Sequence, residues 1–218
     1  MAREVAAVLI AKWKFSRFYE PKWIDSLHTF KDNPSTLGYQ VEKICLACIA
    51  SIGLNYDGKS TKPQAPIWFR GRNLDALLDA ISPTDPSGLY LPSHPQFEDI
   101  DALILEYNHT AKTLNVIPIQ VTINKKHKDS ETLFYNKWKK LALKFPGITL
   151  TSTFIWITEL TKSSKTITEE VRETRTMLQM KKQTHQQVFL AAEDVHKPLA
   201  EALERIRDLQ KERDLALY

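Results

Sequence analysis

The sequence contains only two cysteines among its 218 residues, and it lacks any apolar run long enough to cross a membrane. So few cysteines argue against a disulfide framework and favour a reducing compartment. The missing apolar run argues for a soluble protein without a membrane partner. Near the N-terminus, a short apolar run is interrupted by Lys12 and Lys14, so it does not predict a signal peptide.

The composition is typical of a globular protein, with 43% hydrophobic residues and five tryptophans. A formal net charge of +4 is mildly basic, which permits a nucleic-acid partner without requiring one. The length suits one sizeable domain with an appendage. Because the sequence becomes polar and helix-forming beyond Lys162, we predict a domain over residues 1–162 and a helical C-terminal extension over residues 163–218.

The predicted C-terminal extension contains apolar residues that alternate in steps of four and three, which is a short heptad-like seam. Pro198 lies within this seam. Because proline is tolerated in the first turn of a helix, the pattern predicts two helices with a break near His196. We interpret these helices as packing or self-association elements. The seam comprises Val188, Ala192, Val195, Leu199, Ala202, Ile206 and Leu209.

A helix is predicted over residues 37–52, because apolar residues recur there at helical spacing. Glu42 borders the apolar face, so it is either a solvated glutamate or a candidate metal ligand. The cysteines form a CxxC in mid-helix, where a redox pair is not expected, and a structural zinc site needs four ligands. We therefore interpret them as core residues. The predicted apolar face comprises Val41, Cys45, Cys48, Ile49 and Ile52.

Residues 53–60, GLNYDGKS, match the phosphate-loop pattern GxxxxGK[ST]. A phosphate loop needs a helix to follow it, so that backbone amides point at the phosphates. Here a helix precedes the glycines, while Pro63 and Pro66 follow them. We interpret the segment as a helix stop followed by a loop.

The next elements are short. We predict a strand from Ile67 to Phe69 and a helix that is capped by Asn73 and runs to about Ile81. Residues 82–96 are rich in proline, serine and glycine, so an irregular loop is expected there.

Two apolar runs, residues 100–107 and 116–123, predict a β-hairpin whose strands are buried on both faces. A polar side chain in such a strand is costly unless it is paired or holds a metal. If the hairpin turns at residues 110–111, Asp101 faces Gln120, at a separation that lets both side chains share one small cation.

Basic residues follow this hairpin, first in a cluster and then on a helix predicted from about Glu131 to Lys144, where Trp138 lies among them. Clustered lysines with an interleaved aromatic residue are typical of a phosphate-backbone surface, and a solvated face is the alternative. Residues 154–158, FIWIT, are predicted to close the sheet. The candidate nucleic-acid-binding residues are Lys125, Lys126, His127, Lys128, Lys137 and Lys140.

Glu42 on a helix, Asp101 at one strand and Gln120-Val121-Thr122 on its neighbour form a series that resembles the restriction-endonuclease-like PD-(D/E)XK superfamily. More narrowly, LYLP, FEDIDALIL and IPIQVTINKKH are similar to the nuclease-type domain of retrotransposon hot spot (RHS) and Crinkler proteins, whose motif also has glutamine in place of the acid. The resemblance covers about residues 37–158. It implies an α/β fold with a mixed sheet flanked by helices, and metal-dependent cleavage of DNA, with RNA not excluded.

The resemblance also assigns ligands. Asp101 would bind Mg²⁺ directly, Gln120 would offer its amide oxygen, Val121 its backbone carbonyl, and Glu42 would reach the ion directly or through water. These are hard oxygen donors, which Mg²⁺ prefers, and Mn²⁺ is expected to substitute. Asp99 is the reserve ligand if the strand begins two residues earlier.

One position departs from the family pattern. The catalytic lysine of the family, which orients the attacking water, corresponds to Thr122. Lys125, Lys126 and His127 are its candidate replacements, and Gln120 itself is expected to weaken metal binding because it lacks an acid's charge. Three functions therefore stay open: an Mg²⁺-dependent DNA endonuclease, an inactive nucleic-acid-binding pseudo-nuclease or effector interaction module, and an association module. The resemblance also implies an NTPase domain of the parent protein as a partner, and a nuclear location, including a host nucleus for a secreted effector.

Overall fold

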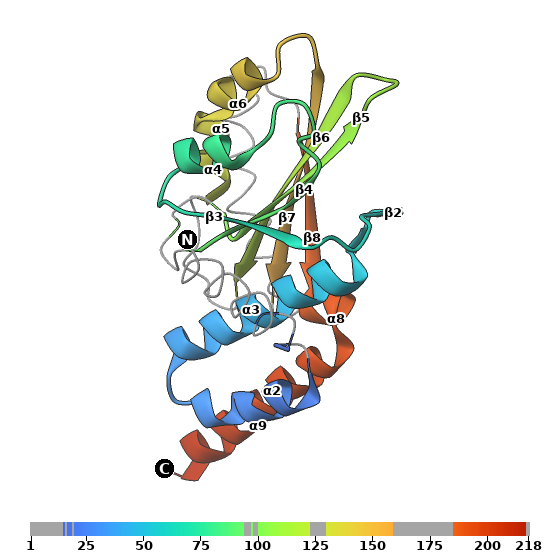
Figure 1. Ribbon diagram of the computed structural model, residues 1–218. Coiled ribbons are helices and arrows are strands. Elements are labelled where there is room, and N and C mark those ends of the chain that lie inside the picture. Colours follow the sequence, from blue (N-terminus) through green and yellow to red (C-terminus); the bar gives the residue numbers. More distant parts are fainter. Residues whose placement is uncertain are drawn as a thin grey trace, which may run out of the picture. The chain divides into compact units, whose positions relative to one another are not determined.

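The computed structural model describes residues 15, 17–18, 20–93, 97, 100–122, 130–158 and 185–216. Over these residues the chain is an α/β protein with a mixed six-stranded sheet flanked by helices and a C-terminal helix, so the predicted fold class is confirmed (Figure 1). The chain forms two compact units. One consists of residues 1–64 with 190–218, and the other consists of residues 65–189, which differs from the predicted division at residue 162.

The sheet contains its six strands in chain order. The first two strands are parallel, the second, third and fourth form an antiparallel meander, and the fourth and fifth are parallel. Such a mixed sheet needs a long crossover before its fifth strand, and helices α5 and α6 lie in that crossover. The strands are β3 (Pro66–Phe69), β4 (Gly88–Pro92), β5 (Ala102–Asn108), β6 (Thr113–Thr122), β7 (Thr149–Thr158) and β8 (Gln186–Ala191).

The irregular loop predicted over residues 82–96 is wrong in its centre, because residues 88–92 form strand β4 between β3 and β5. Leu89, Tyr90 and Leu91 are each only 1% exposed. The Tyr90 hydroxyl donates a hydrogen bond to the Pro86 carbonyl oxygen at 2.9 Å. Three apolar residues between prolines are enough for a short buried strand, although the surrounding composition is typical of a loop.

Three helices belong to the same unit: α4 (Leu74–Ala80), α5 (Ser130–Asn136) and α6 (Trp138–Lys144). The predicted cap is confirmed, because Asn73 Oδ1 accepts a hydrogen bond from the Ala76 amide at 3.2 Å. The single helix predicted over residues 131–144 is wrong, because it is interrupted at Lys137 (φ −98°, ψ 2°). One hydrophobic core joins these helices to the sheet, and its members include Leu74, Leu77, Leu103, Val116, Phe134, Leu141, Phe154 and Trp156.

Strand β7 contains the predicted strand FIWIT, but it does not close the sheet, because β8 lies beyond it. Residues 186–191 were expected to be part of a helical tail, and that expectation is wrong. Val188 therefore lies in β8 and not in the helical seam. Pairing with β7 decides the structure of this segment, which includes the strand-favouring residues Val188 and Phe189.

The other unit is mainly helical, and its longest upstream helix is α3, which corresponds to the helix predicted over residues 37–52. Asn33 Oδ1 accepts from the Thr36 amide at 3.1 Å, and Pro34 occupies the first turn. The predicted apolar face is buried except for Ile52, which is 65% exposed because the helix ends there at Gly53. The unit contains α2 (Pro21–Asp25), the 3₁₀ helix η1 (Ser26–Phe30), α3 (Pro34–Ile52), β1 (Asn55–Tyr56), β2 (Lys59–Ser60), α8 (Ala192–Val195) and α9 (Lys197–Ala216).

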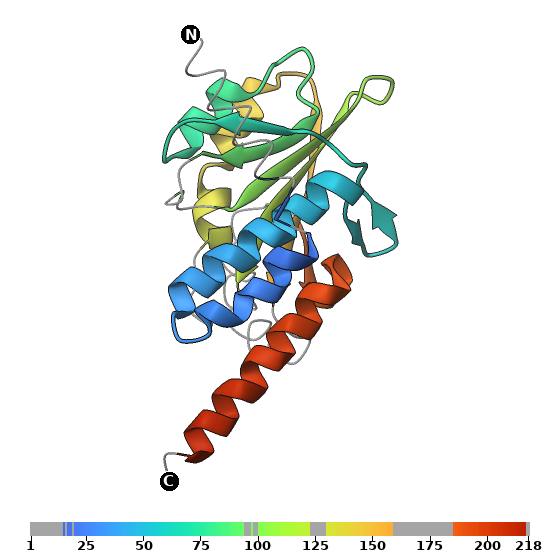
Figure 2. The ribbon, with the colours of Figure 1, turned by 60° about the horizontal axis from the view of Figure 1, so that its bottom comes forward.

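The predicted break near His196 is confirmed, because α8 ends at Val195 and α9 begins at Lys197. Helix α9 packs against α2 and η1 (Figure 2). Leu199 and Ile206 of the seam are 0% and 2% exposed, whereas Leu209 is 43% exposed. The seam therefore serves internal packing over most of its length.

The segment that matches the phosphate-loop pattern forms a small hairpin of β1 and β2, where a loop was expected. Asp57 (φ 45°) and Gly58 (φ 71°) form its turn, as the Asp-Gly pair favours. Residues 61–65 are not helical and lead into β3, so the geometry of a phosphate loop is not present. Among the helices that the structure describes, none combines the length and hydrophobicity that a membrane crossing requires.

Candidate metal centre

The hairpin of β5 and β6 has the predicted register. Ala102 pairs with Ile119 and Asn108 pairs with Thr113, so paired residue numbers add up to 221 along the whole hairpin. Asp101 lies one residue before β5, and its amide donates to the Ile119 carbonyl oxygen at 2.9 Å. This contact extends the hairpin and places Asp101 opposite Gln120, as predicted.

Asp101 and Gln120 are in direct contact. Gln120 Nε2 donates a hydrogen bond to Asp101 Oδ2 at 2.6 Å. The backbone amide of Val121 donates to the same oxygen at 2.7 Å. Gln120 is only 4% exposed, whereas Asp101 is half-buried. The pair therefore combines a buried side chain of β6 with a partly accessible side chain just before β5.

The three oxygen donors that the sequence suggested for a cation are close to one another. Gln120 Nε2 lies 2.6 Å from Asp101 Oδ2 and 3.5 Å from the Val121 carbonyl oxygen, so one amide group touches both other predicted ligands. The carboxylate, carbonyl and amide oxygens form a set that suits Mg²⁺. In this arrangement the amide presents its nitrogen to the other two groups. Cation binding therefore requires the Gln120 amide to rotate so that its oxygen faces the ion.

Thr122 occupies the position of the expected catalytic lysine, and its side chain is buried at 6% exposure. The proposed substitutes Lys125, Lys126 and His127 lie outside the described residues, as do Lys128 and the reserve ligand Asp99. Their roles stay predictions.

Glu42 lies on α3, in the other compact unit, and its predicted role as a ligand stays a prediction. Its carboxylate accepts a hydrogen bond from Lys43 Nζ at 2.6 Å. The side chain of Lys43 is only 10% exposed, and its ammonium group lies 5.1 Å from the centre of the Tyr39 ring. Sequence reasoning did not identify this pair, because adjacent residues of a helix are expected to point in different directions.

The lysine surface is partly used within the protein. Lys140 Nζ forms an ion pair with Asp75 at 2.8 Å, and Lys144 Nζ donates to the carbonyl oxygen of Leu78. Both contacts fasten α6 to α4. Lys137 lies at the junction between α5 and α6, where it is half-buried. The nucleic-acid-binding role of Lys137 and Lys140 stays a prediction.

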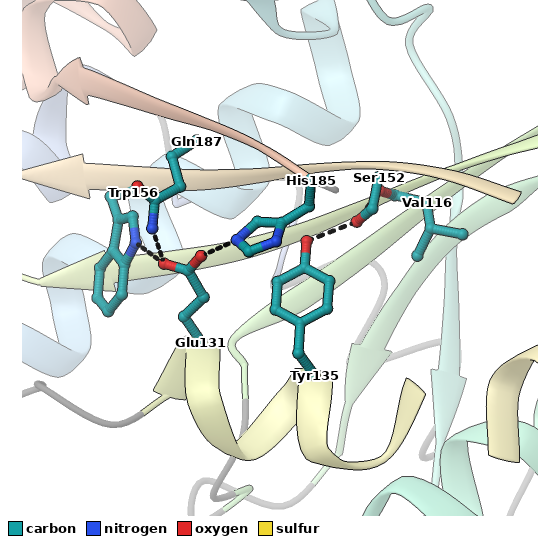
Figure 3. Close-up of polar contacts among 7 residues, drawn as sticks. All are labelled: Val116, Glu131, Tyr135, Ser152, Trp156, His185 and Gln187. Atoms are coloured by element: carbon teal, nitrogen blue, oxygen red, sulfur yellow. Dashed lines mark hydrogen bonds and ion pairs between the residues drawn. The ribbon is translucent and has the colours of Figure 1, made fainter. Parts of the chain in front are cut away.

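A second polar cluster, which the sequence did not predict, surrounds Glu131 at the start of α5 (Figure 3). The side chain of Glu131 is 1% exposed. Its Oε2 accepts from Trp156 Nε1 at 3.2 Å and from Gln187 Nε2 at 2.5 Å, and its Oε1 contacts His185 Nε2. The donors come from β7, from β8 and from the residue before β8, so one carboxylate links the helix to two strands. We call Glu131, Trp156, His185 and Gln187 the Glu131 cluster.

Next to the Glu131 cluster, Tyr135 stacks on His185 with ring centres 4.0 Å apart. The Tyr135 hydroxyl and Ser152 Oγ are hydrogen-bonded at 2.7 Å, and Ser152 donates to the Val116 carbonyl oxygen at 3.0 Å (Figure 3). Burial, with a smaller contribution from the Glu131 charge, raises the pKa of Tyr135 far above its ordinary value. Tyr135 therefore stays protonated and donates to Ser152.

Only a weak signal for the Glu131 cluster is present in the sequence. A glutamate at a helix start is usually a solvated residue that favours the helix dipole. Its partners lie 25, 54 and 56 residues further along the chain, so only the sheet topology brings them together. The one available signal is that Glu131 and Tyr135 are four residues apart and so share a helix face.

The prediction that Cys45 and Cys48 are core residues is confirmed, because both are buried. Burial raises the pKa of the Cys48 thiol to about 12. A thiol with so high a pKa is a poor nucleophile at neutral pH, which argues against redox chemistry at this position.

Comparisons with known proteins found no match to a protein-family model, to a curated protein or to a solved structure. Within the part of the chain that the structure describes, no group of three or more His, Cys, Asp or Glu side chains is arranged to hold a metal ion. The candidate metal centre consists of one carboxylate, one amide and one backbone carbonyl. It therefore differs in kind from a group of three His, Cys, Asp or Glu side chains.

Proposed function

We propose that this chain is a metal-dependent nuclease domain that cleaves phosphodiester bonds in DNA. The observation that carries the proposal is the contact of Asp101 with Gln120 and Val121 at the end of the buried hairpin. A polar group in such a strand is costly unless it is paired or holds a ligand, and this pair also places a carboxylate beside amide and carbonyl groups whose oxygens suit a divalent cation.

In this proposal Asp101, Gln120 and the Val121 carbonyl hold Mg²⁺, or Mn²⁺ in its place. When bound, the ion would supply a polarising charge for the phosphate and an activated water. Val121, as part of β6, keeps its carbonyl fixed through the sheet, and the Gln120 amide turns its oxygen to the ion. The buried strands β5 and β6 keep the Val121 carbonyl and the backbone of Gln120 in place before substrate binds, which lowers the cost of organising the site.

A second candidate, an inactive nucleic-acid-binding protein, is favoured by one observation. The position expected to carry the catalytic lysine contains a buried threonine, Thr122. Without a positively charged side chain at position 122, the developing negative charge on the phosphate lacks one stabilising partner. This candidate predicts DNA affinity that falls with rising salt, with no cleavage at any metal concentration.

Nicking of supercoiled plasmid DNA distinguishes the two candidates. The nuclease requires Mg²⁺ or Mn²⁺, stops in EDTA and loses activity on the order of a hundredfold or more in Asp101→Asn, because metal charge stabilisation is worth several kcal/mol. Asp79→Asn, which changes an exposed carboxylate on α4, is the matched control and should keep full activity. Nicking that persists in EDTA contradicts the nuclease proposal, and a single-stranded RNA substrate tests the alternative nucleic acid.

A further inference from the structure

The Glu131 cluster lies beside the candidate metal centre, on the same face of the sheet. Gln120 and Trp156 are paired in register on the adjacent parallel strands β6 and β7. Paired residues on neighbouring strands project from the same face. Trp156 donates a hydrogen bond to Glu131 at 3.2 Å (Figure 3). The side chain of Trp156 therefore lies between Gln120 and the buried carboxylate of Glu131.

The hydrogen bonds of the Glu131 cluster indicate its charge. Trp156 and Gln187 each donate an N–H group to Glu131, and His185 Nε2 contacts the other oxygen of the carboxylate. His185 Nδ1 is buried and has no hydrogen-bond partner among the described residues. A proton on Nδ1 would be a buried donor without an acceptor, which costs more than an unpaired acceptor nitrogen. A neutral imidazole with its proton on Nε2 matches these contacts, and in this form the cluster carries the negative charge of Glu131.

This buried negative charge matches a deficit at the metal centre. Gln120 stands where an acid would otherwise contribute a second negative charge, so Asp101 is the charged member of the set formed by Asp101, Gln120 and the Val121 carbonyl. We infer that Glu131 supplies the missing negative charge from behind Trp156 and so strengthens the binding of a divalent cation at Asp101 and Gln120. Glu131 is a positioning and electrostatic residue in this account, because it does not touch the cation.

The expected size of the effect follows from the sheet geometry. One strand spacing separates Gln120 from Trp156, and Glu131 lies a hydrogen bond beyond, so the carboxylate is on the order of 10 Å from the cation. At that separation in a protein environment, a buried unit charge changes the affinity for a divalent ion by about tenfold or more. Because Coulomb energy is proportional to ion charge, a tenfold effect on Mn²⁺ corresponds to about thirtyfold on Tb³⁺.

The inference rests on the proposed cation site, and metal titration tests it without any nuclease assay. Mn²⁺ binding is measured by electron paramagnetic resonance and Tb³⁺ binding by its sensitised luminescence. Glu131→Gln should weaken Mn²⁺ binding by about tenfold and Tb³⁺ binding by a larger factor. Adding Gln120→Glu to this variant should restore the affinity, because it returns the charge at another position.

Two controls separate charge from structure. Trp156→Phe removes the hydrogen bond but keeps the charge, so it should bind Mn²⁺ nearly as tightly as the unaltered protein. Equal losses for Mn²⁺ and Tb³⁺ in Glu131→Gln would indicate a structural effect and overturn the inference. Thermal unfolding checks that each variant is folded.

If Glu131→Gln does not fold, His185→Gln keeps the inference testable. This variant replaces a neutral imidazole by a neutral amide, so an unchanged Mn²⁺ affinity is expected. Tighter binding would mean that His185 carried a positive charge that cancelled Glu131, and it would overturn the inference. An unaltered protein that does not bind Mn²⁺ would overturn both the inference and the proposed metal centre, whereas binding that is insensitive to Glu131→Gln would overturn the inference alone.

Discussion

Gln120 and Trp156 are paired in register on the parallel strands β6 and β7, so the glutamine that contacts Asp101 lies beside the tryptophan that contacts Glu131. This pairing connects the Asp101–Gln120 contact with the Glu131 cluster, whose residues are far apart in the sequence. It places the candidate metal centre and the Glu131 cluster on one face of one sheet.

Asp101 also contributes to stability without any metal, because its Oδ2 accepts two hydrogen bonds from the neighbouring strand. Asp101→Ala leaves the buried Val121 amide unpaired, so we expect the free energy of unfolding to fall by about 1–3 kcal/mol. Urea denaturation in EDTA measures this loss. The exposed Asp79→Ala should change stability by less than about 0.5 kcal/mol, and equal losses in both variants would refute the role of Asp101.

Glu131→Ala should destabilise the protein more strongly, because it leaves three side chains without their acceptor, of which Trp156 is buried. Leaving a buried donor without its acceptor costs about 1–3 kcal/mol for each group. Urea denaturation gives this value, and the near-ultraviolet circular dichroism of Trp156 reports whether its surroundings change. A loss below about 1 kcal/mol would show that the cluster contributes little to the fold.

Gly53 and Gly58 offer a matched pair, because both have positive φ angles, of 81° and 71°. A Cβ atom at Gly53 would lie 2.2 Å from the Thr61 carbonyl oxygen, whereas nothing lies within 4 Å of a Cβ at Gly58. Gly58→Ala should cost about 1–2 kcal/mol from backbone strain alone. Gly53→Ala should cost clearly more, and thermal unfolding ranks the two variants. The opposite order would be inconsistent with the backbone geometry at the end of α3.

The Cys48 thiol should resist modification, because burial raises its pKa to about 12. At pH 8 we expect a disulfide reagent such as dithionitrobenzoate to react with both cysteines in urea but with neither in the native protein. The pKa of the Cys48 thiol is higher in the folded protein than in the unfolded chain, so the thiol favours the folded state less as the pH rises. The free energy of unfolding should thus decrease above about pH 9. Rapid labelling of the native protein would contradict this burial.

Substitution of Lys140 distinguishes a role in stability from a role in nucleic-acid binding. Its ion pair with Asp75 is more than half exposed, so Lys140→Ala should change stability by less than about 1 kcal/mol. If the α6 surface binds nucleic acid, the same variant should weaken DNA binding and lower the salt dependence by about one charge. Fluorescence anisotropy against salt concentration measures this. Lys62→Ala, an exposed lysine of the other unit, is the control, and an equal loss there would argue against a specific surface.

The hairpin was predictable because it depends on local pattern. Two continuous apolar runs and a short polar turn determine both strands and their register, and the register alone places Asp101 opposite Gln120. Strand β4 was not predictable in the same way, because Leu89, Tyr90 and Leu91 are too few to outweigh the surrounding prolines, serines and glycine.

The Glu131 cluster depends on long-range structure, which periodicity does not reveal. Gln187 and His185 reach Glu131 only because residues 186–191 pair with β7 as β8, although the segment was predicted to belong to a helical tail. The break at His196 was predictable, by contrast, because a proline near a helix start acts locally.

The most direct test of the metal centre is Mn²⁺ titration of the full chain and of Asp101→Asn, followed by electron paramagnetic resonance. Asp101→Asn keeps a side-chain oxygen that can accept from the Val121 amide, so the hairpin should persist. The negative charge of Asp101 is lost. We predict that the unaltered protein binds Mn²⁺ and that Asp101→Asn weakens this binding at least tenfold, while Asp79→Asn binds normally. Mn²⁺ binding of equal strength in all three proteins would contradict a cation site at Asp101 and Gln120.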